Sequence, residues 1–142
     1  MIYHFKIHKE GQGFWAECLE IPNCSTQGET LSELKENSHE ALNLLLDEPE
    51  NSKIIFPLPK QRLKVSKSIF EVKVEPSIAF AFLMRRMRLQ KGLNQHQMKN
   101  LLKFKTLFSY QKLEKSKYAN PTLKSMDHIK ACFPDFPYHL LF

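Results

Sequence analysis

The stretch from Leu93 to Leu123 constrains the fold of this chain more than any other feature. A glycine just before it is a typical helix terminator, and Asn94 can cap the helix that follows. A short loop then leads to another helix near Thr106, and Asn120 followed by proline is typical of the start of a third. The charged side chains of the stretch are nearly all lysines. The pattern predicts a compact helical segment with a basic surface.

The whole C-terminal part, residues 77–142, is expected to be an all-α domain, because its apolar residues recur at helical spacing. The first helix is expected from Ser77 to about Gly92. A second helix follows the Asn94 cap, and the recognition helix of a helix-turn-helix pair is expected from about Thr106 to Lys115. The expected core positions are Phe80, Met84, Met87, Met98, Leu101, Phe108, Leu113, Leu123, Met126, Ile129 and Phe133, with Leu102 as a further candidate.

Residues 1–60 are expected to form a small α+β domain, a three-to-four-stranded sheet with one helix on a face. Alternating or short apolar runs predict strands at 3–8, 14–19, 25–28 and 54–56. Thr30 and Glu33 match a capping box, so a helix is expected from there to about Leu46. Its inward stripe is expected at Leu31, Leu34, Ser38, Ala41 and Leu45.

Residues 61–76 are expected to link the two domains. Residues 60–68 are basic and polar, whereas 69–75 alternate between apolar and charged side chains, which is the pattern of a strand. This strand has no obvious neighbour in sequence. It can pair with its symmetry mate in a homodimer or tetramer, or it can add to the sheet of the first domain.

The charges are sorted along the chain. Residues 1–59 carry four lysines against ten acidic residues, whereas residues 77–142 carry twelve lysines and arginines against three acidic residues. A net charge of +6 therefore conceals an acidic first part and a basic second part. This division favours nucleic acid as the partner of the second part and a basic protein as the partner of the first.

Several classes of protein are disfavoured by the composition. Three cysteines without CxxC spacing argue against a disulfide framework or a zinc site. The N-terminus lacks the apolar core of a signal peptide, and no apolar run reaches transmembrane length, so a cytoplasmic protein without a membrane partner is expected. No group of acidic residues or histidines has the spacing of a catalytic or metal centre. We therefore expect no enzymatic activity, no metal and no cofactor.

The polar side chains around the recognition helix point to double-stranded DNA as a partner. In a helix-turn-helix pair, the second helix lies in the major groove and flanking residues contact phosphates. Glutamine can bond bidentately to adenine, and lysine, serine and threonine are common phosphate ligands. The residues expected to contact DNA are Gln95, Lys105, Thr106, Ser109, Tyr110 and Gln111.

In these motifs the chain resembles the HicB antitoxins of type II HicA–HicB toxin–antitoxin systems. The first half is similar to their degraded RNase H-like domain in the segments 14–17, 20–24 and 28–30, and the second half to their Cro/repressor-type helix-turn-helix in 92–95, 110–114 and 120–123. Two departures concern turns. Asn23 stands where the family usually has a glycine, and Lys103 stands where the helix-turn-helix motif favours glycine.

The resemblance implies an antitoxin that is also an autorepressor. The first domain would neutralise a HicA-type mRNA interferase by occluding its RNA-binding surface, and the second would bind operator DNA and repress its own operon. The resemblance also implies a catalytically inactive RNase H-like domain and a homodimer or tetramer. The residues expected to contact the toxin are Trp15, Glu17, Glu20 and Glu29.

Two other interpretations remain open from the sequence. A free-standing helix-turn-helix transcriptional regulator would use its first domain to sense a small ligand, and it would need a pocket there. An RNase H-type nuclease guided by the basic half would need three or more converging acidic residues and a metal ion.

Overall fold

The computed structural model describes residues 1–49, 51–60 and 62–142, which form two compact units. Unit 1 comprises Met1–Leu46 and Phe56–Glu75, and unit 2 comprises Asp47–Ile55 and Pro76–Phe142. The chain thus leaves unit 1, contributes a short segment to unit 2, and returns. The organisation expected from the sequence, with a linker over 61–76, differs from this division because most of that linker belongs to unit 1.

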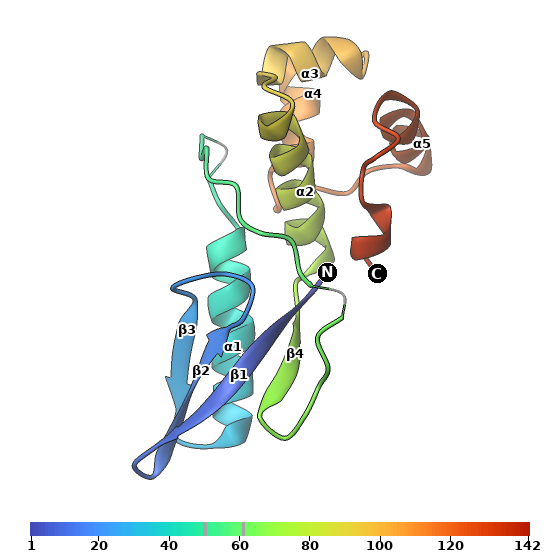
Figure 1. Ribbon diagram of the computed structural model, residues 1–142. Helices are drawn as coiled ribbons and strands as arrows, with labels where there is room; N and C mark the ends of the chain where they lie inside the picture. The colour runs from blue at the N-terminus through green and yellow to red at the C-terminus, as the bar shows by residue number, and fades with distance from the viewer. Residues whose placement is uncertain (50, 61) are drawn as a thin grey trace. The chain divides into compact units, whose positions relative to one another are not determined.

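Unit 1 contains a four-stranded antiparallel sheet, as far as the described residues go, with strand order β3-β2-β1-β4 (Figure 1). The first two strands form a hairpin in which Phe5 lies opposite Cys18 and His8 opposite Trp15. The three expected N-terminal strands are therefore confirmed. The strands are β1 (Ile2–Glu10), β2 (Gly13–Cys18), β3 (Ser25–Gly28) and β4 (Ile69–Lys73).

The fourth strand is not the one expected near residues 54–56, which have no regular secondary structure. That expectation is wrong, and the prolines at 57 and 59, which have no N–H to donate, are consistent with an irregular segment. Of the two arrangements that the sequence allows for the strand near 69–75, the structure has the second. β4 joins the sheet beside β1, with Ile2 opposite Lys73 and Lys6 opposite Ile69.

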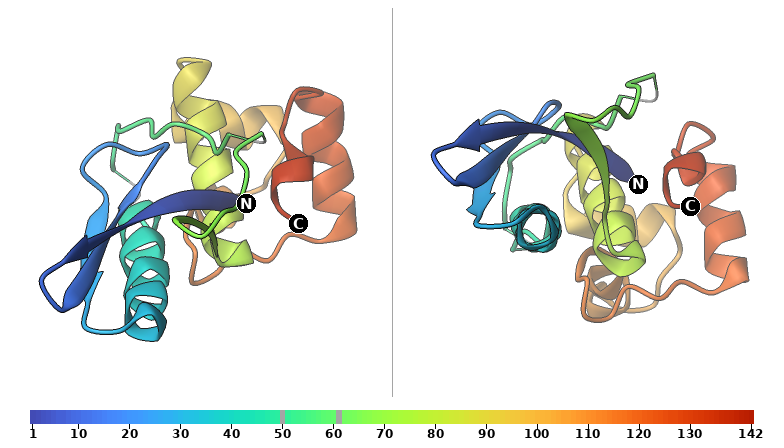
Figure 2. Two further views of the ribbon diagram at one scale, coloured as in Figure 1. Left: turned by 60° about the horizontal axis from the view of Figure 1, so that its bottom comes forward. Right: turned by 90° about the horizontal axis from the view of Figure 1, so that it is seen from below.

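Helix α1 (Leu31–Leu46) lies against one face of this sheet, as the right-hand view of Figure 2 shows. The Glu33 amide donates to Thr30 Oγ1 at 3.1 Å, so the expected cap is confirmed. The expected inward stripe is confirmed at Leu34 and Ser38 and wrong at Leu31, which is 45% exposed. Ala41 and Leu45 are only half-buried. The buried residues are Leu34, Ser38, Leu42, Asn43 and Leu46.

Gly28 sets how closely the sheet and α1 approach one another. A Cβ atom at this position would lie 2.7 Å from the Leu34 backbone nitrogen and 2.9 Å from its Cα. Real side chains do not tolerate such distances, so only glycine fits between the end of β3 and the first turn of α1. The close approach brings the acidic N-terminal turn of α1 next to the β2–β3 edge.

Unit 2 is helical, as expected, and is built around α2 (Figure 1). Leu123 is 85% exposed, and the last long helix is capped by Thr122 rather than by Asn120. In the second helix Met98 is fully buried, as expected, and Leu102, which caps its C-terminal end, is 4% exposed, whereas Leu101 is 47% exposed. The elements are α2 (Pro76–Gln90), α3 (Gln95–Leu101), α4 (Leu107–Gln111), η1 (Lys112–Glu114), α5 (Leu123–Cys132) and η2 (Tyr138–Leu140).

Candidate nucleic-acid interface

The two short helices of the basic stretch each begin at a side-chain cap. Asn94 Oδ1 accepts the Gln97 amide at 2.8 Å, and Gln97 Oε1 accepts the Asn94 amide at 2.8 Å, which completes a capping box at α3. Thr106 Oγ1 accepts the Ser109 amide at 3.1 Å and so caps α4. Helices of this length are marginal in isolation, so these caps fix where α3 and α4 begin.

The turn between α3 and α4 contains a residue in the left-handed region. Lys103 has φ +56°, and its amide donates to the Asn100 carbonyl at 3.2 Å. The next amide, of Phe104, donates to the Lys99 carbonyl at 3.0 Å. Lysine is uncommon in this conformation, which glycine adopts readily. The sequence departure at Lys103 therefore falls at a position where the backbone itself favours glycine.

A buried ion pair anchors α4 and η1 to α2. Arg88 Nε lies 2.9 Å from Glu114 Oε2, and Arg88 Nη2 lies 3.0 Å from Oε1, so the contact is bidentate. Arg88 Nη1 also donates to the Leu93 carbonyl at 3.2 Å. Burial works against the Arg88 charge, but the hydrogen bonds and negative charge of Glu114 raise the pKa of Arg88 above its ordinary value.

Sequence reasoning missed this pair, although a signal was present. Arg88 follows Phe80 and Met84 at intervals of four residues, so a charged side chain stands on the apolar stripe of α2. Glu114 likewise follows the buried Tyr110 by four residues. Charged residues are almost never fully buried unless they are paired, and two of them on facing apolar stripes indicate a buried pair.

The residues expected to contact DNA do not all lie on the surface. Lys105 and Thr106 are exposed, and Ser109 is half-buried. Gln95 and Gln111, one from each helix, are joined by a hydrogen bond of 3.0 Å from Gln111 Nε2 to Gln95 Oε1. Their side chains are thus already oriented at the junction of α3 and α4.

Tyr110 was expected to contact DNA, but its side chain is fully buried and does not reach the surface. Burial, followed by the negative charge of Glu114, raises the pKa of Tyr110 well above its ordinary value. Its hydroxyl makes no hydrogen bond of acceptable geometry within the described part of the chain. Tyr110 therefore belongs to the core beneath α4.

Phe108 was expected in the core, but its side chain is 52% exposed. Its ring contacts the Tyr118 ring edge to face, with centroids 6.5 Å apart and planes at 68°. Three lysine ammonium groups lie over these rings at 5.0 to 5.8 Å. We call this set the Phe108 surface, and its members are Phe108, Lys112, Lys115, Lys117 and Tyr118.

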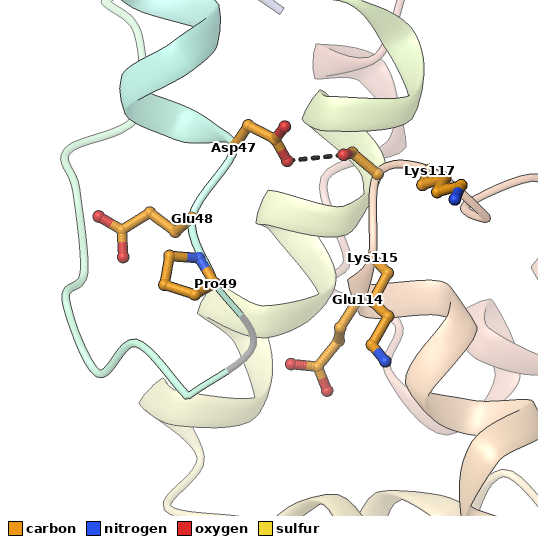
Figure 3. Close-up of a pocket in the computed structure, with 7 residues that line it drawn as sticks. Asp47, Glu48, Pro49, Glu114, Lys115 and Lys117 are labelled. Carbon is orange, nitrogen blue, oxygen red and sulfur yellow. Dashed lines mark hydrogen bonds between the residues drawn. The ribbon is translucent and has the colours of Figure 1, made fainter.

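A groove of about 470 Å³ adjoins the Phe108 surface within unit 2 (Figure 3). Ser116 Oγ donates to Asp47 Oδ1 at 2.6 Å across it, as the dashed line in Figure 3 shows. The groove mixes carboxylates with ammonium groups, so it offers no site of a single charge. Its lining residues are Asp47, Glu48, Pro49, Glu114, Lys115, Ser116 and Lys117.

The residues expected to contact a toxin are divided among separate places in unit 1. Trp15 and Glu17 share the sheet face opposite α1, where the Trp15 ring stacks on His8 at 4.1 Å. His8 Nε2 lies 3.3 Å from Glu17 Oε1. Glu29 lies elsewhere, exposed at the start of α1, where its amide donates to Glu33 Oε2 at 2.9 Å.

Glu20 was expected to contact a toxin, but its side chain is buried and accepts hydrogen bonds from donors inside unit 1. Its carboxylate accepts the His4 amide and lies against His4 Nδ1, each at 2.8 Å. The Lys60 amide donates to the same carboxylate at 3.1 Å. These contacts account for the burial of His4, which is only 5% exposed.

The two cysteines of unit 1 share a side-chain hydrogen bond, which lowers the pKa of Cys24 below its ordinary value. Cys18 and Cys24 are buried free thiols joined through the backbone, with the Cys18 amide 2.8 Å from the Cys24 carbonyl. The neighbouring Cys24 thiol and burial raise the pKa of Cys18 well above its ordinary value, so Cys18 stays protonated. Across the residues that the structure describes, no three histidine, cysteine or acidic side chains are grouped to hold a metal ion.

Comparison with known proteins gives no assignment. No family model matches the sequence, and a search of curated proteins returned no match. In the described ranges, none of the helices combines the length and apolar character needed to cross a membrane.

Proposed function

We propose that unit 2 binds double-stranded DNA and represses transcription from the operon that encodes the chain. The observation that carries this proposal is the pair of capped helices α3 and α4, whose facing glutamines, Gln95 and Gln111, are bonded at 3.0 Å. A glutamine held by a second one presents its amide in a fixed orientation, and an amide is the group that reads adenine bidentately. The buried Arg88–Glu114 pair supports this arrangement by tying α4 and η1 to α2.

Charge supports the same proposal. Lys103, Lys105 and Lys112 are exposed beside α4, and residues 77–142 carry twelve cationic side chains against three acidic ones. Phosphate contacts position a protein on the duplex and account for most of its nonspecific affinity. As a homodimer or tetramer, the protein would place two such helices in successive major grooves about 34 Å apart.

We propose further that unit 1 is an antitoxin module that binds a HicA-type mRNA interferase. Exposed acidic side chains on α1, including Glu33, Glu36 and Glu40, suit a basic, RNA-binding surface. Trp15 stands half-buried on the sheet face opposite α1, and such aromatic side chains are frequent anchors of protein interfaces. Occlusion of the toxin by these surfaces needs no catalytic group in unit 1.

One pair of variants tests the DNA proposal. Lys105→Glu combined with Gln111→Ala should abolish retention of a duplex carrying the sequence upstream of the gene, because it reverses a phosphate contact and removes a base contact. The matched control, Lys9→Glu with Gln12→Ala, makes the same chemical changes at exposed positions of unit 1 and should leave retention unchanged. Equal loss in both would contradict the proposal.

The antitoxin proposal is tested with the same variants. Coexpression of the chain should restore growth to cells that produce a HicA-type mRNA interferase. The variant without DNA binding should restore growth equally well, whereas loss of both activities would contradict the separation of functions. DNA binding without any growth rescue would favour a free-standing regulator.

A further inference from the structure

Phe108 is exposed although its neighbours in the same helical segment are buried. α4 and η1 turn Tyr110 and Leu113 into the core of unit 2, at 0% and 6% exposed. Phe108 stands on the other side of the same short helix at 52% exposed. A half-exposed phenylalanine on a surface rich in lysine leaves part of its ring accessible to a partner.

The Phe108 ring is held in place before any partner binds. The edge of Tyr118 lies against it at 6.5 Å, and the ammonium groups of Lys112 and Lys115 lie 5.0 and 5.8 Å from its centroid. Each of these contacts restricts rotation of the ring. A ring that is already oriented loses little conformational entropy on binding, as a recognition residue requires.

The charge around the ring selects the partner. Lys112 and Lys117 are exposed on the Phe108 surface, and the carboxylates nearest to it in the described part of unit 2 line the adjoining groove. A second copy of this surface or a basic protein would meet like charge. A DNA duplex offers what the surface lacks, with phosphates for the lysines and one apolar group in the major groove, the C5-methyl of thymine.

We propose that Phe108 determines sequence specificity by packing its ring on a thymine C5-methyl group while the exposed Lys112 holds a flanking phosphate. This inference rests on the proposed function of unit 2, and it adds which base is recognised and which residue recognises it. Phenylalanine makes only apolar contact, and thymine is the only base whose major-groove edge carries a methyl group.

The test uses the full chain and a pool of short DNA duplexes with a randomised central segment. Retained duplexes are sequenced, and each preferred thymine is then replaced singly by deoxyuridine, which removes only the methyl group. The wild-type chain should lose about fourfold in affinity at one such position, the value for one buried methyl group. Phe108→Ala should bind thymine and deoxyuridine duplexes equally, and Phe108→Leu should retain part of the difference.

Lys112→Ala is the matched control, because it changes a neighbour on the same surface. It should weaken binding to all duplexes alike, reduce the salt dependence of binding, and leave the fourfold methyl effect intact. If the wild-type chain enriches a sequence but Phe108→Ala keeps the full methyl effect, the inference falls while DNA binding stands. If the wild-type chain retains no duplex, the proposed function falls, and the inference with it.

Discussion

At the scale of single residues, two described residues other than glycine have positive φ angles. These are Asn23, with φ +62°, and Lys103, with φ +56°. Asparagine tolerates the left-handed region because its short side chain can bond locally, whereas lysine has no such compensation. The strain is therefore concentrated at Lys103, beside the proposed DNA-binding helix.

Lys103→Gly should raise the free energy of unfolding by about 1 kcal/mol, because glycine removes the steric cost of a left-handed L-residue. Chemical denaturation of the full chain measures this. The control is Lys105→Gly, which removes the same charge at a position without a positive φ and should lower stability. Equal effects of the two substitutions would show that charge, and not backbone strain, is responsible.

Tyr110→Phe should make stability less sensitive to alkaline pH. The unfolded phenol titrates near 10.0, whereas burial raises the pKa of Tyr110 in the folded chain. Above pH 10 the unfolded state therefore holds fewer protons, and wild-type stability falls by up to about 1.4 kcal/mol per pH unit. The variant should lack this contribution and match the wild type near neutral pH, because the lost hydroxyl has no hydrogen-bond partner among the described residues.

Thermal unfolding between pH 7 and pH 11 measures the difference. Tyr138→Phe is the comparison, because burial raises the pKa of Tyr138 to about 12 but its hydroxyl donates to the Met126 carbonyl at 2.5 Å. That variant should lose stability at every pH. If the stability of Tyr110→Phe fell with rising pH in parallel with that of the wild type, the buried phenol would not be the cause of the loss.

At the scale of elements, the contact between β3 and α1 depends on one missing side chain. Gly28→Ala would place a methyl carbon 2.7 Å from the Leu34 nitrogen, and backbone atoms cannot move aside as a flexible side chain can. We expect a loss of about 2 to 3 kcal/mol in the free energy of unfolding. Gly13→Ala, whose nearest atom would be the Gly28 carbonyl oxygen at 3.3 Å, should cost clearly less.

The Arg88–Glu114 pair should show the asymmetry of buried charges. Glu114→Ala leaves the Arg88 guanidinium buried without its partner and should cost about 3 to 5 kcal/mol. Arg88→Met combined with Glu114→Leu removes both charges and should recover most of that loss. Denaturation measures both variants, and a double variant as unstable as the single one would show that the pair is itself strongly stabilising.

The sequence predicted the elements that depend on local signals and missed the parts that depend on distant partners. The strands near 3–8, 14–19 and 25–28 and the caps at Thr30 and Asn94 follow from alternation and short-range hydrogen bonds. Phe108 and Tyr110 were expected with their environments reversed, because helical spacing does not determine which side faces the core when a helix has five residues. The burial of Glu20 depends on His4 and Lys60, which no local pattern connects.

At the scale of the whole molecule, the segregated charges predict how the chain responds to salt. If unit 2 alone contacts the duplex, each lysine at a phosphate contributes about 0.9 to the slope of log affinity against log salt. Lys112→Ala should reduce the magnitude of the slope by about that amount. Glu36→Gln changes the net charge by the same amount in the other direction on α1, and it should leave the slope unchanged. A similar change for both would mean that total charge governs binding.

The position of β4 in the sheet has a consequence for synthesis of the chain. β1 pairs with β4, yet 58 residues separate the end of one from the start of the other. Until those residues have been synthesised, one edge of β1 exposes backbone amides and carbonyls that have no neighbouring strand to pair with. Such an unpaired edge is prone to association with other nascent chains. A fragment that stops at residue 60 would remain permanently in this state. The proposed binding of a toxin by such a fragment should therefore be limited by its aggregation, whatever the strength of its contacts.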